Sequence, residues 1–116
     1  MSESEINRKN TNQTDFKKIV VESVYETLHA VLGQSVSEPL ALYLQSYLGI
    51  SNGEMPNHIE PLFTALNDLF GIGGKTLCKA IVKTMYKKTG VPFYEVGYRP
   101  MIEYVQELEN KLANSQ

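Results

Sequence analysis

Two stretches of this chain follow one helix template, and they constrain its fold more than any other feature. Residues 35–50 read SVSEPLALYLQSYLGI and residues 57–72 read NHIEPLFTALNDLFGI. Each begins with a capping residue, Ser35 or Asn57, continues with Glu-Pro-Leu and closes with Gly-Ile. Ser and Asn accept hydrogen bonds from the first free amides of a helix, proline fits the first turn, and glycine takes the left-handed position after the last turn. Both stretches are therefore predicted to be helices, whether they arose by duplication or by convergence on the same capping chemistry.

The template also predicts contacts at the ends of these helices. Glu38 and Glu60 stand at the capping-box position, where a carboxylate reaches back to the amide of the capping residue. The proline that follows each glutamate is expected in the first helical turn, where a missing amide costs least. Ile50 and Ile72 follow the closing glycines, where a hydrophobic contact back to the helix accompanies such ends.

Hydrophobic periodicity predicts three further helices. Apolar residues at three- and four-residue steps from Asp15 indicate a first helix that Gly33 closes. The same spacing indicates a helix over residues 74–89 and a last helix from near Pro100. Residues 91–99 are expected to be extended or to form a short strand, and no alternating pattern is long enough for a sheet. The sequence therefore predicts an all-α protein, a compact bundle of about five helices.

Length and composition fit a single domain. The chain has 116 residues, of which 42% are hydrophobic and 21% charged, an ordinary globular profile. Residues 1–14 are polar, so a disordered tail is predicted there, followed by one helical domain at residues 15–113. The single cysteine, Cys78, excludes an internal disulfide and favours a reducing, cytoplasmic setting. No apolar run approaches the roughly 20 residues that span a bilayer, and the start is no signal peptide, so no membrane partner is expected.

The run Gly71-Ile72-Gly73-Gly74-Lys75-Thr76 looks like the end of a phosphate-binding loop. The Walker motif needs a glycine five positions before Gly74, and Leu69 stands there instead. The loop must also follow a buried strand, whereas a predicted helix precedes it here. The run is therefore interpreted as a tight corner between two helices, in which the glycines stop one helix and let the next approach closely.

A stripe of lysines follows this corner. Lysines recur every four residues after Gly74, so they share one side of the predicted helix, and Tyr86 is expected beside them. The candidate binding residues are Lys75, Lys79, Lys83, Lys87 and Arg99. The opposite, apolar side of the same helix carries Leu77, Cys78, Ile81, Val82 and Met85.

Three interpretations of the stripe remain open. It is a solvated outer face, the commonest role of a charge run, or it binds an acidic protein surface, or it contacts phosphates of DNA or RNA. Residues 35–70 carry four acidic and no basic side chains, whereas residues 74–99 are predominantly basic, and this segregation suits either kind of partner. Two helices joined at a glycine corner also resemble a helix-turn-helix, although Asn67 replaces the small residue that the motif favours.

Nothing in the sequence indicates catalysis. His29 and His58 are the only histidines, and neither has a cysteine or carboxylate at metal-ligand spacing. Cys78 lies on the apolar side of its predicted helix, so a buried inert thiol is expected. No enzyme activity, metal or cofactor is therefore predicted.

Several short motifs resemble a known archaeal family. They are Val20 to Leu28, Pro-x-x-Ile-Glu at 56–60, Leu-Phe-Gly-x-Gly-x-Lys at 69–75, Met-Tyr-Lys-Lys-Thr-Gly at 85–90 and Glu-Tyr-Val at 103–105. Over about residues 19–108 the chain is similar to the fifth type of the Nitrosopumilus output domain of thaumarchaeal ammonia oxidisers. The resemblance implies a stand-alone or appended output module of signalling or transcriptional regulation, with no catalytic residues to carry over.

These observations lead to a hypothesis with two alternatives. The leading hypothesis is a non-catalytic helical regulatory module that acts by protein–protein contacts, expected as a homodimer. The first helix is one candidate dimer surface, and the other consists of Ile102, Val105, Leu108 and Leu112. The first alternative is a phosphate-directed DNA- or RNA-binding protein that uses the basic fourth helix. The second is a small-ligand site lined by Tyr43, Tyr47, Phe63, Phe70 and Met85.

Overall fold

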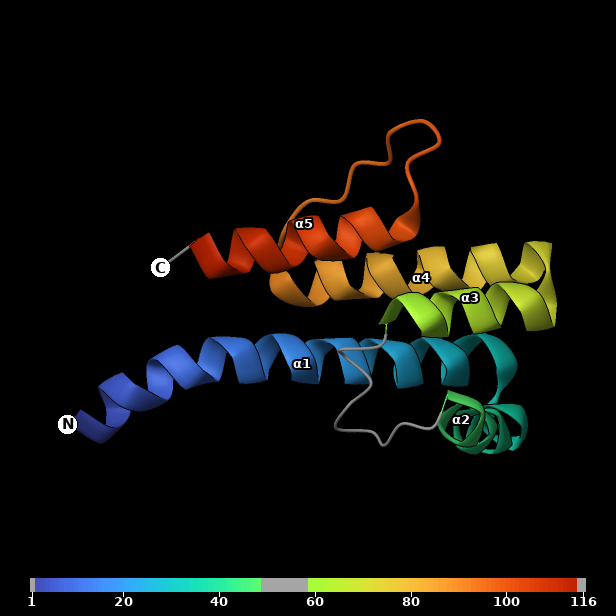
Figure 1. Cartoon of the computed structure of the whole chain (residues 1–116), viewed down its shortest axis with the longest axis horizontal. Helices are drawn as coiled ribbons and strands as arrows, with labels where there is room; N and C mark the ends of the chain where they lie inside the picture. The colour runs from blue at the N-terminus through green and yellow to red at the C-terminus, as the bar shows by residue number, and fades with distance from the viewer. Residues whose placement is uncertain (1, 49–58, 115–116) are drawn as a thin grey trace.

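The structure is a computed structural model that describes the backbone of residues 2–48 and 59–114 and the side chains of residues 16–46 and 59–114 (Figure 1). Its helices are α1 (Ser2–Leu32), α2 (Gln34–Leu48), α3 (Ile59–Phe70), α4 (Ile72–Thr89) and α5 (Met101–Asn114). The described residues form no strand, including residues 91–99, and the predicted all-α bundle of five helices is confirmed. Within these ranges no helix combines the length and apolar character that crossing a membrane requires.

Helix α4 is the centre of the bundle. It packs against α1, α3 and α5, and α1 also contacts α2 and α5. Figure 1 shows α1, α3, α4 and α5 running along the long axis of the molecule, whereas α2 is seen end-on and crosses α1. These neighbours bury one side of α4, and the side that carries Lys75, Lys83 and Lys87 stays open to solvent.

The buried side of α4 is the one that the sequence predicts. Leu77, Cys78, Ile81, Val82 and Met85 are each at most 3% exposed. They meet a core to which α1, α2, α3 and α5 all contribute. Burial of each large apolar side chain contributes about 1.5–3 kcal/mol, so this side of α4 holds the fold together.

The prediction for Tyr86 is wrong. Its side chain is 3% exposed, and its hydroxyl donates to the backbone carbonyl of Tyr104 on α5 at 2.7 Å. Periodicity within one helix separates an apolar side from a polar side, but it does not show how many neighbours cover the helix. Here α5 covers the sector of α4 in which Tyr86 lies.

The glycine corner between α3 and α4 is confirmed. Gly71 has a positive φ of 58°, but its ψ of −125° differs from the left-handed helical conformation that was predicted. Its amide donates to the Asn67 carbonyl at 2.7 Å, and its own carbonyl accepts from the Gly74 amide at 2.9 Å. At Gly74 a Cβ would lie 2.3 Å from the carbonyl oxygen of Leu66, so the two backbones touch. A single residue thus ends one helix and begins the next, and α4 starts two residues before the predicted position.

Helix α2 starts differently from the template. Gly33, with φ 82°, donates to the carbonyl of His29 at the end of α1 and accepts from the amide of Ser37 at the start of α2. Ser35 therefore lies inside the helix rather than at its cap, and Pro39 lies beyond the first turn. Glu38 accepts from the Gln34 side-chain amide at 3.3 Å instead of forming a capping box. The capping predictions for Ser35 and Glu38 are wrong because Gly33 already supplies the acceptor.

The remaining predictions for the helix ends have three different outcomes. Ile72 is 85% exposed, so the hydrophobic contact predicted for it is wrong. Ile50, Asn57 and His58 lie outside the described residues. Pro61 lies in the first turn of α3 as predicted. Gly90, with φ 76°, ends α4 after Thr89 as predicted.

The backbone of α1 is helical from Ser2, so the helix start predicted at Asp15 is wrong. Figure 1 shows the first turns of α1 extending past the ends of the other helices. Phe16, the first residue whose side chain is described, is 7% exposed and belongs to the core. The bundle packing thus begins where the predicted domain does, and disorder of residues 1–14 stays a prediction.

Candidate binding face on helix α4

The lysine stripe divides into free and paired members. Lys75, Lys83 and Lys87 are exposed, and the part of the chain that the structure describes supplies no ion-pair partner for them. We call these three residues the basic face. Lys79 instead has its Nζ 2.7 Å from Oε1 of Glu95, in a pair that is about two-fifths exposed. Such a surface pair contributes only about 0.2–1 kcal/mol, but it removes one free cation from the stripe.

Arg99 is engaged inside the chain. Its guanidinium contacts Glu107 at 2.5 Å and Glu103 at 3.2 Å, and it lies 4.7 Å from the ring centre of Tyr104. The hydrogen bond from Arg99, with a further one from Lys111, lowers the pKa of Glu107 below its usual value. Arg99, predicted as a binding residue, therefore attaches the preceding loop to α5.

Lys88 joins α4 to α1. Its Nζ lies 2.6 Å from Oε2 of Glu26 and 3.7 Å from Oε1 of Glu22. The hydrogen bond to Glu26 is the main cause that raises the pKa of Lys88. Next to this pair, the hydroxyls of Thr27 and Thr84 are 3.2 Å apart. The α1–α4 contact thus contains a polar strip beside its apolar centre.

The loop at residues 91–100 has a buried inner side and an exposed outer side. Phe93 packs between Tyr86 and Tyr104, with ring centres 5.2 and 5.1 Å away. The Tyr104 hydroxyl accepts from the Val96 amide at 2.7 Å and lies 3.4 Å from the Val96 carbonyl. This single phenol therefore holds the middle of the loop to α5.

On the outer side the loop presents aromatic groups that sequence reasoning missed. Tyr94 is 76% exposed and Tyr98 is fully exposed. Their backbone is held by Phe93, Val96 and Arg99, so the rings stand on a fixed support. The only signal in the sequence is the density of aromatic residues in a segment that lacks helical periodicity.

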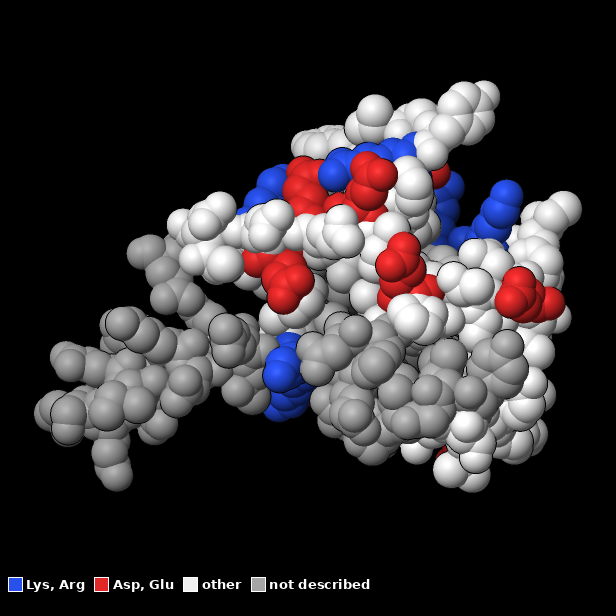
Figure 2. Space-filling model, viewed as in Figure 1, with Lys and Arg blue, Asp and Glu red and all other residues white. Residues whose placement is uncertain are grey.

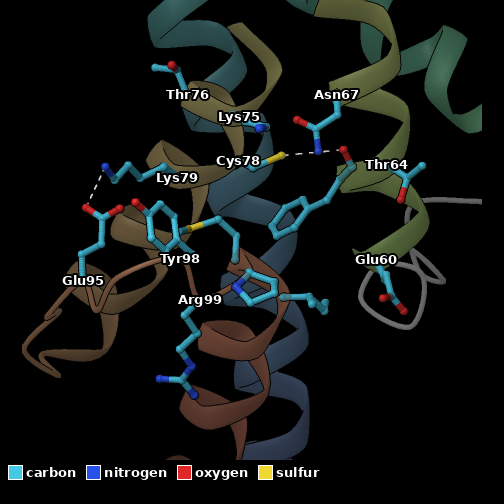
Figure 3. Close-up of a pocket in the computed structure, with 14 residues that line it drawn as sticks. Glu60, Thr64, Asn67, Lys75, Thr76, Cys78, Lys79, Glu95, Tyr98 and Arg99 are labelled. Atoms are coloured by element: carbon cyan, nitrogen blue, oxygen red, sulfur yellow. Dashed lines mark hydrogen bonds and ion pairs between the residues drawn. The ribbon is translucent and has the colours of Figure 1, made fainter. Parts of the chain in front are cut away.

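A groove of about 630 Å³ lies beside the basic face. Its walls come from α3, from the first half of α4 and from residues 95–102. Figure 3 shows Lys75 and Asn67 near one end of this groove and Glu60 at the other, with the Lys79–Glu95 pair on the side of the loop. The side-chain oxygen Oδ1 of Asn67 is buried and has no hydrogen-bond partner. Lys75, Lys79 and Arg99 all line the groove, so the structure brings three of the five predicted binding residues to one place.

A second groove, of about 650 Å³, lies between α1 and α2. Its lining includes Tyr25, Glu26, His29 and Gln45, and the Gln45 side-chain amide donates to the Tyr25 hydroxyl at 2.7 Å. The groove therefore has an acidic and aromatic lining, unlike the groove beside the basic face. Of the proposed aromatic ligand site, Met85 is completely buried in the core, whereas Tyr43 and Phe70 are exposed.

The candidate dimer surface on α5 is used within the chain. Val105 is 3% exposed and Leu108 is fully buried in the core, with Ile102 and Leu112 packed partly against it. The prediction that Val105 and Leu108 form a dimer surface is therefore wrong, because α1 and α4 already cover them. The homodimer itself stays a prediction.

The chemically reactive groups are inert or dispersed. Burial raises the pKa of the Cys78 thiol from 9.0 to about 12, so the thiolate that would act as a nucleophile is disfavoured. Among the described residues, no three of His, Cys, Asp and Glu come together to hold a metal ion. His29 is exposed on α1.

The surface charge is mixed rather than uniformly basic. Figure 2 shows acidic side chains scattered over the face that carries α3 and α5, with basic side chains emerging behind them along the upper edge. The whole chain carries a net charge of −2. The basic face is thus a local feature on a weakly acidic molecule. Comparisons of this chain with family models, with curated proteins and with solved structures find no match.

Proposed function

We propose that this protein is a non-catalytic interaction module of signalling or transcriptional regulation, and that its basic face binds an acidic surface of another protein. One observation carries the proposal: Lys75, Lys83 and Lys87 lie exposed along α4 without an ion-pair partner among the described residues. Lys83 and Lys87 stand one turn apart, where like charges repel by about 0.2–0.5 kcal/mol. A carboxylate of a partner relieves that repulsion when it binds.

The tyrosines of the neighbouring loop support a protein partner. Tyr94 and Tyr98 project from a backbone that Tyr104 and Arg99 hold in place. Tyrosine is enriched at protein interfaces because a rigid ring supplies a large contact area with little loss of side-chain entropy. A basic stripe beside fixed tyrosines can therefore combine charge complementarity with apolar contact.

Binding to phosphates of DNA or RNA ranks second. A single residue, Gly71, joins α3 and α4, and Figure 1 shows the two helices side by side and antiparallel. A helix-turn-helix instead needs a turn of about three or four residues and helices that cross at about 90–120°. Glu95 also neutralises Lys79 in the middle of the stripe. These features favour a protein partner over a nucleic acid.

The assignment to signalling or transcriptional regulation rests on the resemblance to the Nitrosopumilus output domain. The all-α fold agrees with that resemblance. The buried Cys78 thiol also agrees with a module that has no catalytic residues.

Fluorescence anisotropy tests the proposed partner class. Labelled oligo-glutamate, duplex DNA and single-stranded DNA of equal charge are titrated with the full chain over a range of salt concentrations. The double variant Lys83→Glu/Lys87→Glu is compared with Lys17→Glu/Lys18→Glu, which makes the same charge change at exposed positions of α1. We expect tighter binding of oligo-glutamate than of either DNA, and a loss of about tenfold, or ~1.4 kcal/mol, only in the α4 variant. Tighter binding of DNA, or an equal loss in the α1 variant, would contradict the proposal.

A further inference from the structure

The groove beside the basic face has a more specific chemistry than the lysine stripe. We propose that it binds an extended acidic peptide segment of the partner protein, with a carboxylate at Lys75 and an adjacent apolar side chain on the groove floor. This inference rests on the proposed function in taking the partner to be a protein, but it relies on Lys75 and Asn67 rather than on Lys83 and Lys87. Figure 3 shows the residues involved.

The floor of the groove is apolar. Phe63 and Cys78, at 6% and 2% exposure, form its deepest part, and the partly buried Met101 and Ile102 continue it toward α5. An apolar side chain seated here leaves water and contacts α3, α4 and α5 at once. The thiol takes no part in chemistry, because its hydrogen lies toward the Phe63 carbonyl and burial raises its pKa.

The charges along the groove give the ligand a direction. Lys79 is held by Glu95, and Arg99 is held by Glu103 and Glu107. Lys75 is therefore the cation of the groove that has no partner among the described side chains. Glu60 lies at the opposite end, so a second carboxylate is disfavoured there. The groove suits a segment that is acidic at the Lys75 end and neutral or basic at the Glu60 end.

Asn67 points to a ligand that donates a hydrogen bond. Its Oδ1 is buried without a partner, and a buried acceptor in this state is unfavourable until a donor reaches it. The backbone N–H groups of an extended peptide are such donors. The sugar–phosphate backbone of DNA presents only acceptor oxygens, so it would leave Asn67 unsatisfied; the RNA backbone adds a 2′-hydroxyl donor. The combination of a free lysine and an unpaired acceptor therefore favours a peptide over a DNA backbone.

The groove is accessible along its length. Thr64 and Thr76 are exposed on its two helical walls, and Tyr98 is fully exposed on the loop side. An open groove of this kind can hold an extended peptide that continues beyond both of its ends, whereas small-molecule sites enclose most of their ligand. The Tyr98 ring is placed to contact the outer side of such a chain.

Selection from a displayed random-peptide library on the immobilised full chain tests the proposal. We expect enriched peptides in which Asp or Glu stands next to Leu, Ile or Phe. Against the best synthetic peptide, Lys75→Glu is expected to weaken binding by about tenfold or more, and Asn67→Leu by about threefold or more. Lys83→Glu, the same charge change outside the groove, is expected to alter binding by less than about twofold. Circular dichroism confirms that each variant is folded.

Each other outcome overturns the proposal. In the selection, these outcomes are no enrichment or enrichment of peptides without acidic residues. In the binding assay, they are an equal effect of Lys75→Glu and Lys83→Glu, or complete displacement of the peptide by free glutamate. Displacement by free glutamate would identify a small carboxylate as the occupant. Oligo-glutamate binding that depends on Lys83 and Lys87 would then still support the proposed function. Conversely, the selected peptides could depend on Lys75 while oligo-glutamate binding is unchanged in the Lys83→Glu/Lys87→Glu variant. That result would support the groove proposal and overturn the proposed role of the basic face.

Discussion

Replacing Gly74 with alanine should separate α3 from α4. The added Cβ would lie 2.3 Å from the Leu66 carbonyl oxygen and 2.7 Å from the Asn67 Cα, and both are backbone atoms that no rotamer change can move. Gly73 offers a matched control in the same turn of α4. A Cβ there would meet only the Phe70 Cβ at 3.7 Å, an ordinary van der Waals distance.

The expected magnitudes follow from two opposing effects. Alanine is preferred over glycine inside a helix by about 0.5–1 kcal/mol, so Gly73→Ala should stabilise the protein by about that amount. Gly74→Ala gains the same preference, but the two backbones must move apart by roughly 1 Å, and overpacking of this kind costs typically about 1–3 kcal/mol or more. The two variants have identical compositions and share the helix preference, so their unfolding free energies should differ by the overpacking cost alone, about 1–3 kcal/mol or more.

Urea unfolding followed by far-ultraviolet circular dichroism measures this difference. With a shared m value, the midpoint should move up for Gly73→Ala and down for Gly74→Ala. If Gly74→Ala is as stable as the unmodified chain, α3 and α4 do not touch at this corner, and the explanation of the glycine run as a packing device is refuted.

The remaining predictions concern three buried side chains. Because the Cys78 thiol has its pKa raised from 9.0 to about 12 in the folded chain, it should react with a disulfide reagent at neutral pH only after unfolding in urea. The pKa of the thiol is higher in the folded chain than in the unfolded chain, so the protonated thiol favours folding. This contribution to the free energy of unfolding is complete below pH 9 and is lost as pH rises toward 12. Cys78→Val lacks the thiol, so its free energy of unfolding, measured by urea unfolding at each pH, should decline less steeply over that window. Tyr104→Phe removes the acceptor of the Val96 amide, so hydrogen exchange at Val96 should accelerate while the α4 amides keep their protection. Tyr86→Phe removes a buried 2.7 Å hydrogen bond and should cost about 1 kcal/mol of unfolding free energy.

The parts of the fold that local chemistry determines were predictable. Gly71 and Gly90 have the positive φ values that end helices, as the sequence predicts, and Gly74 makes the expected close approach to α3. The buried side of α4 followed from the spacing of Leu77 to Met85. These features depend on neighbours within one or two helical turns, which a sequence displays directly.

The errors have one local and one tertiary source. Locally, Gly33 serves both α1 and α2, so Ser35 was not needed as a cap. Tyr86 and Leu108 are buried because α4 and α5 pack together, and no pattern within either helix reveals that contact. The sequence identifies residues that could cap a helix or form a surface, whereas the folded structure decides which of them take that role.

The candidate site shows the same division. The positions of Lys75, Lys83 and Lys87 along one side of α4 follow from their spacing, but their lack of partners depends on where the 91–100 loop places Glu95. Arg99 lies in the same loop but faces α5 instead. The unpaired Asn67 oxygen had no signal in the sequence, because its burial depends on tertiary packing.

The position of α1 in the bundle has a consequence for synthesis on the ribosome. Val20, Val24 and Leu28 of α1 are at most 1% exposed in the folded chain, and they share the core with Leu108 of α5. Leu28 and Leu108 lie 80 residues apart in the sequence, so translation at about 5–20 residues per second separates their synthesis by roughly 4–16 s. The domain therefore completes its core only after α5 has been made, and a nascent chain that stops before α5 leaves the α1 side chains that share the core with Leu108 without that part of their packing.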